Sequence, residues 1–66
     1  MQILLNGETR QLPDGASVAA LLERLELTGK RFAVEVNEEV VPRSEYAQVG
    51  LHEGDRVEIV RAIGGG

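Results

Sequence analysis

The chain has 66 residues, with eleven acidic and seven basic side chains and a formal net charge of −4. A chain of this length is expected to fold as one small domain with a thin core, with no second domain and no deep substrate pocket of its own. Its acidic balance repels phosphate backbones and so disfavours nucleic acid as a partner. We interpret the acidic surface first as a means of keeping the protein soluble. The alternative interpretation is that it complements a basic surface on a partner.

The sequence contains no cysteine, which favours a reducing cytoplasm and leaves no thiolate chemistry to consider. Its first residues lack the basic segment of a signal peptide and reach a turn signal at Asn6-Gly7. No apolar run approaches the roughly 20 residues of a membrane-spanning helix. We therefore expect a cytoplasmic protein with no membrane partner.

A β-hairpin is predicted at the start of the chain. Ile3 and Leu5 alternate with polar or outward-facing positions, which is the period of a half-buried strand. Asn6-Gly7 suits a type I′ turn because both residues tolerate positive φ. A second strand is predicted over residues 8–12, and Pro13 ends it because proline cannot donate to a strand ladder.

One amphipathic helix is predicted over about residues 18–28, with Ser17 as its N-cap. Its apolar residues recur at the spacing of a single helical face. They are Val18, Leu21, Leu22 and Leu25. We expect Gly29 to end the helix in the left-handed conformation, and Lys30 and Arg31 to suit its negative end.

Three further strands are expected: an alternating one from Phe32 to Val36, a short one at 40–41 and a last one over 56–63. The apolar residues within 43–49 follow neither a helical nor a strand period, so we expect a turn or a 3₁₀ segment there. The turn at 50–55 should anchor Leu51 in the core. In the last strand, Val57 and Ile59 should point inward.

This order of elements predicts an α+β fold of the β-grasp (ubiquitin-like) type, a mixed four- to five-stranded sheet with one helix packed on one face. One helix cannot shield both faces of the sheet, so the other face should stay open. The sheet must be mixed if the last strand is to pack beside the first in so short a chain. We expect the β-grasp domain to span residues 1–63 and a flexible glycine tail to span 64–66.

The side chains offer no convincing catalytic or metal site. His52 is the only histidine and lies in an acidic turn, and the serines have no evident base. The acidic residues Glu35, Glu38 and Glu39 fit a solvated hairpin tip better than a calcium site, because they lack an oxygen-ligand pattern. We expect no catalytic residue, no bound metal and no bound cofactor.

The tail Gly64-Gly65-Gly66 is the strongest functional signal in the sequence. Glycines cost backbone entropy and fill no core, so packing does not explain three of them after a strand. A strand without side chains could instead enter a narrow channel in another protein. The Gly66 carboxylate at its tip would become reactive if it were first converted to an acyl-adenylate and then to a thiocarboxylate.

A set of short motifs is spread over the whole chain: Asn6-Gly7, Val36-Asn37, Val41-Pro42-Arg43 with Tyr46 soon after, Gly54-Asp55, and the final Gly65-Gly66. In these motifs the chain resembles the ThiS family of sulfur carriers over its whole length. Tyr46 stands where the family often has tryptophan, which should affect packing rather than role. Gly64 makes the tail one glycine longer than the usual pair, so the sequence leaves its register in a partner channel open.

The resemblance implies that partner enzymes act on the chain, which is then a co-substrate and not an enzyme. A ThiF-like adenylyltransferase would activate Gly66 with ATP and Mg²⁺. Sulfur from a desulfurase persulfide would form the thiocarboxylate, and a ThiG-like thiazole synthase would take this sulfur for thiamine biosynthesis.

A docking surface is expected on the open sheet face, at Leu4, Val60 and Ala62, because small exposed apolar patches often mark interaction sites. Single exposed apolar residues are also normal on protein surfaces. Arg43 and Arg61 could pair with acids on a partner or could simply be solvated.

Several other functions remain open from the sequence. The nearest is the small subunit of molybdopterin synthase, although that family tends to be longer and to carry proline just before Gly-Gly. Thiocarboxylate carriers for cysteine, methionine or siderophore synthesis share the same chemistry. A protein conjugator would share only the activation step, because its acyl-adenylate would pass to a lysine. A ubiquitin-like interaction module without covalent chemistry belongs to a different class.

Overall fold

The computed structural model describes residues 1–27 and 31–61. Within these ranges the chain forms five strands, one α-helix and one 3₁₀ turn. In chain order they are β1 (Gln2–Leu5), β2 (Glu8–Gln11), α1 (Val18–Arg24), β3 (Phe32–Val36), β4 (Glu39–Val41), the 3₁₀ helix η1 (Arg43–Glu45) and β5 (Arg56–Arg61).

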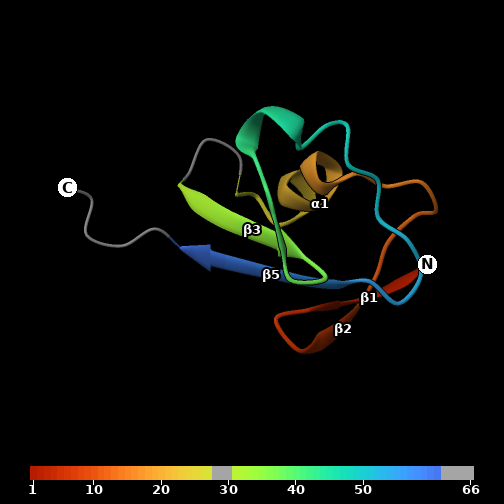
Figure 1. Cartoon of the computed structure of the whole chain (residues 1–66). Coiled ribbons are helices and arrows are strands. Elements are labelled where there is room, and N and C mark those ends of the chain that lie inside the picture. Colours follow the sequence, from red (N-terminus) through yellow and green to blue (C-terminus); the bar gives the residue numbers. More distant parts are fainter. Residues whose placement is uncertain (28–30, 62–66) are drawn as a thin grey trace.

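The strands form one sheet in the order β2-β1-β5-β3-β4. β5 lies in the middle, parallel to β1 on one side and antiparallel to β3 on the other. Helix α1 covers one face of this sheet, and the arrow of β5 points away from the N-terminus (Figure 1). The predicted mixed sheet with one helix on one face is therefore confirmed.

The core lies between helix α1 and the sheet. Val18, Leu21, Val34 and Val57 are almost completely buried, and Leu51 anchors the loop before β5 as predicted. The other buried members of this cluster are Ile3, Leu5, Leu12, Ala16 and Leu22. Inward residues of β1, β3 and β5 alternate with outward ones, which confirms the period read from these segments.

Both hairpins turn through residues with positive φ. Asn6 and Gly7 have φ values of 49° and 84°, as the type I′ prediction requires. The hairpin between β3 and β4 uses Asn37 and Glu38, at 52° and 71°. A glutamate in this region is strained, because its Cβ comes close to the following carbonyl oxygen.

The helix begins where the sequence predicts but ends earlier. The Oγ of Ser17 accepts a hydrogen bond from the Ala20 N–H at 3.1 Å, which confirms the N-cap. The last helical residue is Arg24, not residue 28, so the predicted length is wrong. Gly29 and Lys30 lie outside the described residues.

A Schellman motif ends the helix at Glu26. Its φ is 59°, its N–H donates to the Glu23 carbonyl at 3.0 Å, and the Leu27 N–H donates to the Leu22 carbonyl at 2.9 Å. Leu27 packs against the core, as the apolar residue after such a motif commonly does. Burying Leu27 requires the chain to leave the helix at this point, although the left-handed residue is not glycine.

Other predicted bounds differ from the structure by one residue: β2 ends at Gln11 and not at Leu12, and β4 begins at Glu39 and not at Val40. Val40 and Val41 lie in β4, and residues 43–45 form the predicted 3₁₀ turn. Strand β5 begins at Arg56 as expected and is described as far as Arg61. The predicted continuation to Ile63 and the separate tail at 64–66 lie outside the described residues.

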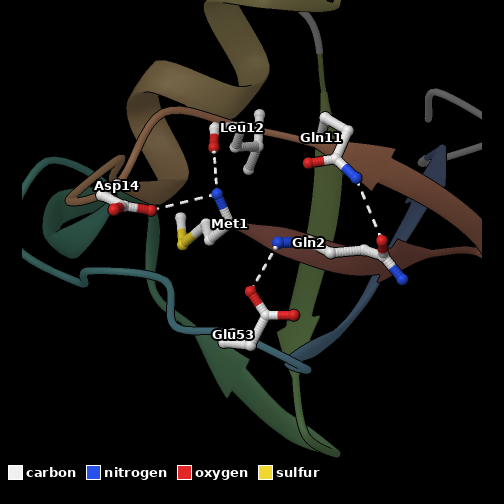
Figure 2. A network of polar contacts seen from close by, with 6 residues as sticks. All are labelled: Met1, Gln2, Gln11, Leu12, Asp14 and Glu53. Carbon is white, nitrogen blue, oxygen red and sulfur yellow. Dashed lines mark hydrogen bonds and ion pairs between the residues drawn. The ribbon is translucent and has the colours of Figure 1, made fainter.

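A polar network ties β1 to the loops around it (Figure 2). The Met1 α-amino group donates to the Leu12 carbonyl at 2.7 Å and to the exposed Asp14 Oδ1 at 3.0 Å. The Gln2 N–H donates to Glu53 Oε1 at 2.9 Å. These contacts join the first strand to the segments on either side of it.

None of the described helical segments has the length or the apolar character needed to span a lipid bilayer.

Candidate functional site

The described part of the predicted site is strand β5 and the open sheet face beside it. Ala62, Gly64, Gly65 and Gly66 lie outside the described residues, so their roles remain predictions. Arg61, the last residue of β5, lies opposite Phe32 at the start of β3.

Asn6 supports one side of β5 with its side chain. β1 pairs with β5 only as far as Leu5 and Val57, and the chain then turns away at Asn6-Gly7. The Asn6 N–H still donates to the Val57 carbonyl at 2.9 Å, and its Oδ1 accepts from the Ile59 N–H at 2.9 Å. The Asn6 Nδ2 also donates to the Ile59 carbonyl at 3.4 Å. The side chain thus extends the ladder beyond the end of β1.

Asn37 supports the other side of β5 in a similar way. Its N–H donates to the Arg56 carbonyl at 2.7 Å, and its Oδ1 accepts from the Arg56 N–H at 3.0 Å. Its Nδ2 donates to Asp55 Oδ1 at 3.0 Å, while Asp55 Oδ2 accepts from the His52 N–H at 2.8 Å. The network joins the β3–β4 hairpin to the turn that precedes β5.

These contacts assign a structural role to residues that the family resemblance rests on. Asn6, Asn37 and Asp55 each hold β5 or the turn before it. Tyr46 is half-buried against the core, and its hydroxyl donates to the Phe32 carbonyl at 3.4 Å. The expectation that Tyr46 serves packing agrees with this position. The sequence marked Asn6 as a turn residue and Asn37 as part of the family resemblance, and the side-chain bonds of both to β5 were not predicted.

The open face carries the exposed apolar side chains that the structure describes. Leu4 is 38% exposed and Val60 is 56% exposed, as the docking prediction requires, and Val40 is 68% exposed. Leu4 lies beside Arg56, whereas Val60 lies beside Ala33. Since a strand rises about 3.3 Å per residue, Leu4 and Val60 are separated by about 13 Å along the sheet. Glu58 lies between them, and Val40 was not predicted as part of this surface.

The other residues considered from the sequence are dispersed. The His52 side chain is 83% exposed, with its Nδ1 3.8 Å from Asp55 Oδ2. Glu38 lies at the hairpin tip, where its Oε1 is 3.6 Å from Arg56 Nη2. Glu35 instead points to the open face, directly opposite Glu58. Arg43 and Arg61 are both exposed.

A mixed sheet of this strand order, with helix α1 on one face and with the first and last described strands next to each other, defines a β-grasp protein. The family model for the ThiS family matches residues 3–66 of the chain. The chain therefore belongs to the ThiS family. A sulfur carrier protein ThiS from Escherichia coli strain K12 is 36% identical over 66 residues, and the match covers both chains completely.

Two further comparisons extend this result. The chain is 47% identical over 66 residues to part of a thiazole synthase from Paramagnetospirillum magneticum, and it spans only 20% of that protein's length. It spans the same share of a thiazole synthase from Magnetococcus marinus. The crystal structure of a thiamine biosynthesis protein (ThiS) from Geobacter metallireducens superposes with a TM-score of 0.86 at 29% identity, covering both chains completely.

Proposed function

We propose that this chain is a sulfur carrier of thiamine biosynthesis whose Gly66 carboxylate is loaded with sulfur for thiazole formation. The observation that carries the proposal is membership in the ThiS family over residues 3–66, a match that includes the terminal glycines. The full-length similarity to a sulfur carrier of the same size supports it. On this proposal the chain is a co-substrate and not an enzyme.

The proposed chemistry begins with activation of Gly66. A carboxylate oxygen attacks the α-phosphate of ATP, pyrophosphate leaves, and a mixed anhydride with AMP forms. Mg²⁺ bound by the adenylating enzyme would neutralise the charge that develops on the phosphates. Sulfide then attacks the acyl carbon and displaces AMP, giving the thiocarboxylate. If a persulfide attacks instead, an acyl disulfide forms first and a thiol must reduce it to release the thiocarboxylate.

The arrangement of β5 is consistent with this role. The strand is fixed at Arg56 and Ile59 by the two asparagine side chains, so its direction is well determined before it reaches Arg61. A tail that leaves a rigid strand loses less conformational entropy when a partner binds it than a tail that leaves a mobile loop. The glycines of the tail add no side chains that would widen the channel it has to enter.

Two partners follow from the proposal. A ThiF-like adenylyltransferase would supply ATP-dependent activation, and a ThiG-like thiazole synthase would accept the sulfur. The second partner is supported by the two thiazole synthases that contain a segment similar to the whole of this chain. Such segments suggest that carrier and synthase operate together.

Intact-mass measurement of the chain purified from its native cells tests the proposed chemistry. We expect a fraction of molecules to be heavier by the difference between one sulfur and one oxygen atom. Deleting Gly66 should abolish this fraction, whereas the conservative exchange Glu8→Gln, made on an exposed strand, should leave it unchanged. A variant without Gly66 that still supported thiazole formation would contradict the proposal.

The pathway is tested with a deletion strain. Growth that depends on added thiazole supports a role in thiamine biosynthesis, whereas loss of molybdoenzyme activity would identify a molybdopterin synthase subunit instead. An interaction module without covalent chemistry would show neither the mass change nor the thiazole requirement. The similarity to ThiS proteins favours the first outcome.

A further inference from the structure

The turn between β1 and β2 contains two neighbouring residues that can react with each other. Asn6 is followed directly by Gly7, and both are exposed. A Cβ placed on Gly7 would meet nothing within 4 Å, so no neighbouring group covers the main chain there. Because glycine has no side chain, its amide nitrogen is also unshielded and can attack the side-chain amide carbon of a preceding asparagine.

This reaction is a deamidation and consumes only water. The deprotonated Gly7 nitrogen attacks Asn6 Cγ and closes a succinimide ring, the Cγ–Nδ2 bond breaks, and Nδ2 takes up a proton and leaves as ammonia. Water then opens the ring at one of its two carbonyl carbons. Attack at the side-chain carbonyl gives aspartate, whereas attack at the main-chain carbonyl gives isoaspartate, in which the main chain runs through the side-chain methylene. As an intramolecular step, ring closure depends on how well the two atoms are aligned.

The conformation of the native turn opposes ring closure. The ring forms only when Asn6 Cβ is nearly eclipsed with the Gly7 nitrogen, at a ψ of about −120°, which is the value in a type II′ turn. Such a turn requires a φ of about −80° at its next residue, whereas Gly7 has a φ of 84°, as in a type I′ turn. The peptide between Asn6 and Gly7 must therefore rotate before its nitrogen reaches Cγ.

The contacts of Asn6 with β5 oppose the same movement. Its Oδ1 accepts from the Ile59 N–H at 2.9 Å, and its Nδ2 donates to the Ile59 carbonyl at 3.4 Å. Bringing Cγ to the Gly7 nitrogen rotates the side chain and breaks both contacts. The Asn6 N–H, which donates to the Val57 carbonyl at 2.9 Å, fixes the main chain at the same point. The side chain that supports β5 is thus held in a conformation that does not react.

We propose that Asn6 is a deamidation site that the folded chain protects, and that its conversion to isoaspartate releases this side of β5. The additional main-chain carbon of isoaspartate lengthens the turn and moves the carboxylate away from the position of Oδ1, so the bond from the Ile59 N–H is lost. Aspartate keeps an acceptor oxygen at that position. This inference is independent of the proposed function, because it concerns only the first hairpin and its contact with β5.

The protection is tested by incubating the full chain in mildly alkaline buffer and, in parallel, in concentrated urea. Intact mass detects the exchange of an amino group for a hydroxyl, peptide mapping assigns it to Asn6, and an isoaspartyl methyltransferase detects the isoaspartate. We expect deamidation of Asn6 to be at least about ten-fold slower in the folded chain, because the turn and both contacts with Ile59 must open first. Equal rates in buffer and in urea would overturn the protection.

Asn37 is the matched control within the same chain. It also has a positive φ, and its side chain also accepts a hydrogen bond from β5, at the Arg56 N–H. The residue after it is Glu38, whose side chain hinders the attacking nitrogen. In urea, Asn37 should therefore deamidate at least about ten-fold more slowly than Asn6. Equal rates at the two asparagines would overturn the assignment of Asn6-Gly7 as the reactive pair.

The effect on β5 is tested on the separated isoaspartate form after it is returned to buffer. Hydrogen exchange at the Ile59 amide should be at least about ten-fold faster than in the unmodified chain, because this amide has lost its acceptor. The variant Asn6→Asp, which carries the other reaction product, should keep the amide protected. Full protection of the Ile59 amide in the isoaspartate form would overturn the release of β5.

Discussion

Two asparagines each combine a turn conformation with a hydrogen bond to the central strand. Asn6 and Asn37 both adopt positive φ, and both place a side-chain oxygen on a backbone N–H of β5. Asparagine tolerates the left-handed region better than most other non-glycine residues, and its side chain can also accept a hydrogen bond. At each position one asparagine therefore both adopts the turn conformation and accepts a hydrogen bond from β5. This double role explains why the turn residues are also the residues that fix β5.

Replacing Asn6 separates these two needs. Asn6→Gly keeps the turn conformation but removes the bond to the Ile59 N–H, so we expect the free energy of unfolding to fall by about 1 kcal/mol. Hydrogen exchange at the Ile59 amide should become faster. Asn6→Asp keeps an acceptor oxygen and should preserve the protection of that amide. Equal protection in the glycine variant would show that the bond contributes nothing.

Strained glutamates give a second test at this scale. Glu26 and Glu38 have φ values of 59° and 71°, where glycine avoids the steric cost of a Cβ. We expect Glu26→Gly to raise the free energy of unfolding by about 0.5–1 kcal/mol, measured by urea titration. Glu38→Gly should act similarly, since the exposed contact with Arg56 that it loses is worth little.

The control for this test is a glutamate in the helix itself. Glu23→Gly lies within α1 and should lower stability by about 1 kcal/mol, because glycine is a poor helix former. Stabilisation by glycine at all three positions would mean that backbone strain is not the cause.

At the scale of elements, the helix and the sheet share one buried layer and leave one sheet face uncovered. Leu21 of α1 is 1% exposed and packs in the core, whereas Leu4 of β1 points to the open face and is 38% exposed. Both are leucines in regular structure, but only one lies between the two layers. Comparing alanine substitutions at Leu21 and Leu4 therefore measures how much burial between the helix and the sheet contributes to the free energy of unfolding.

Leu21→Ala should lower the free energy of unfolding by about 2–5 kcal/mol, because it removes buried methyl groups and leaves a cavity. A domain this small has a thin core and little stability in reserve, so this variant should be largely unfolded well below the wild-type midpoint. Leu4→Ala should cost under about 1 kcal/mol, since most of its change occurs at the surface. Urea unfolding followed by circular dichroism compares the two, and equal losses would contradict the one-sided core.

At the scale of the whole molecule, stability and proposed reactivity lie in different parts of the chain. Among the residues that the structure describes, the buried ones fall between Ile3 and Val57. The predicted boundary between residues 1–63 and 64–66 has a direct consequence for stability. A chain that ends at residue 63 should unfold with a free energy within about 0.5 kcal/mol of the full chain, because it loses no buried side chain.

The same truncated chain should not acquire sulfur. Thermal or urea unfolding measures the stability of the truncated chain. Its intact mass after incubation with a ThiF-like adenylyltransferase, ATP and a sulfur donor shows whether it has acquired sulfur. A large loss of stability on truncation would show that the last glycines belong to the folded domain and would contradict the predicted division.

The sequence determined the elements because each of them is encoded in the spacing of near neighbours. Alternation predicted β1, β3 and β5, the apolar stripe and Ser17 predicted the start of α1, and Asn6-Gly7 predicted the first turn. It also indicated the terminal glycines as the reactive end, since no packing role accounts for them. These inferences depend on residues a few positions apart.

Tertiary structure decided the features that depend on distant residues. The helix ends at Arg24, and Glu26 and Leu27 complete a Schellman motif that places Leu27 against the core, although no glycine signals this end. The Asn6 side chain reaches Ile59 and the Glu35–Glu58 pair forms only because the register of β5 places these residues side by side. A one-residue shift in that register would move every side chain to the other face, so only the assembled sheet specifies which charges and apolar groups share the open face.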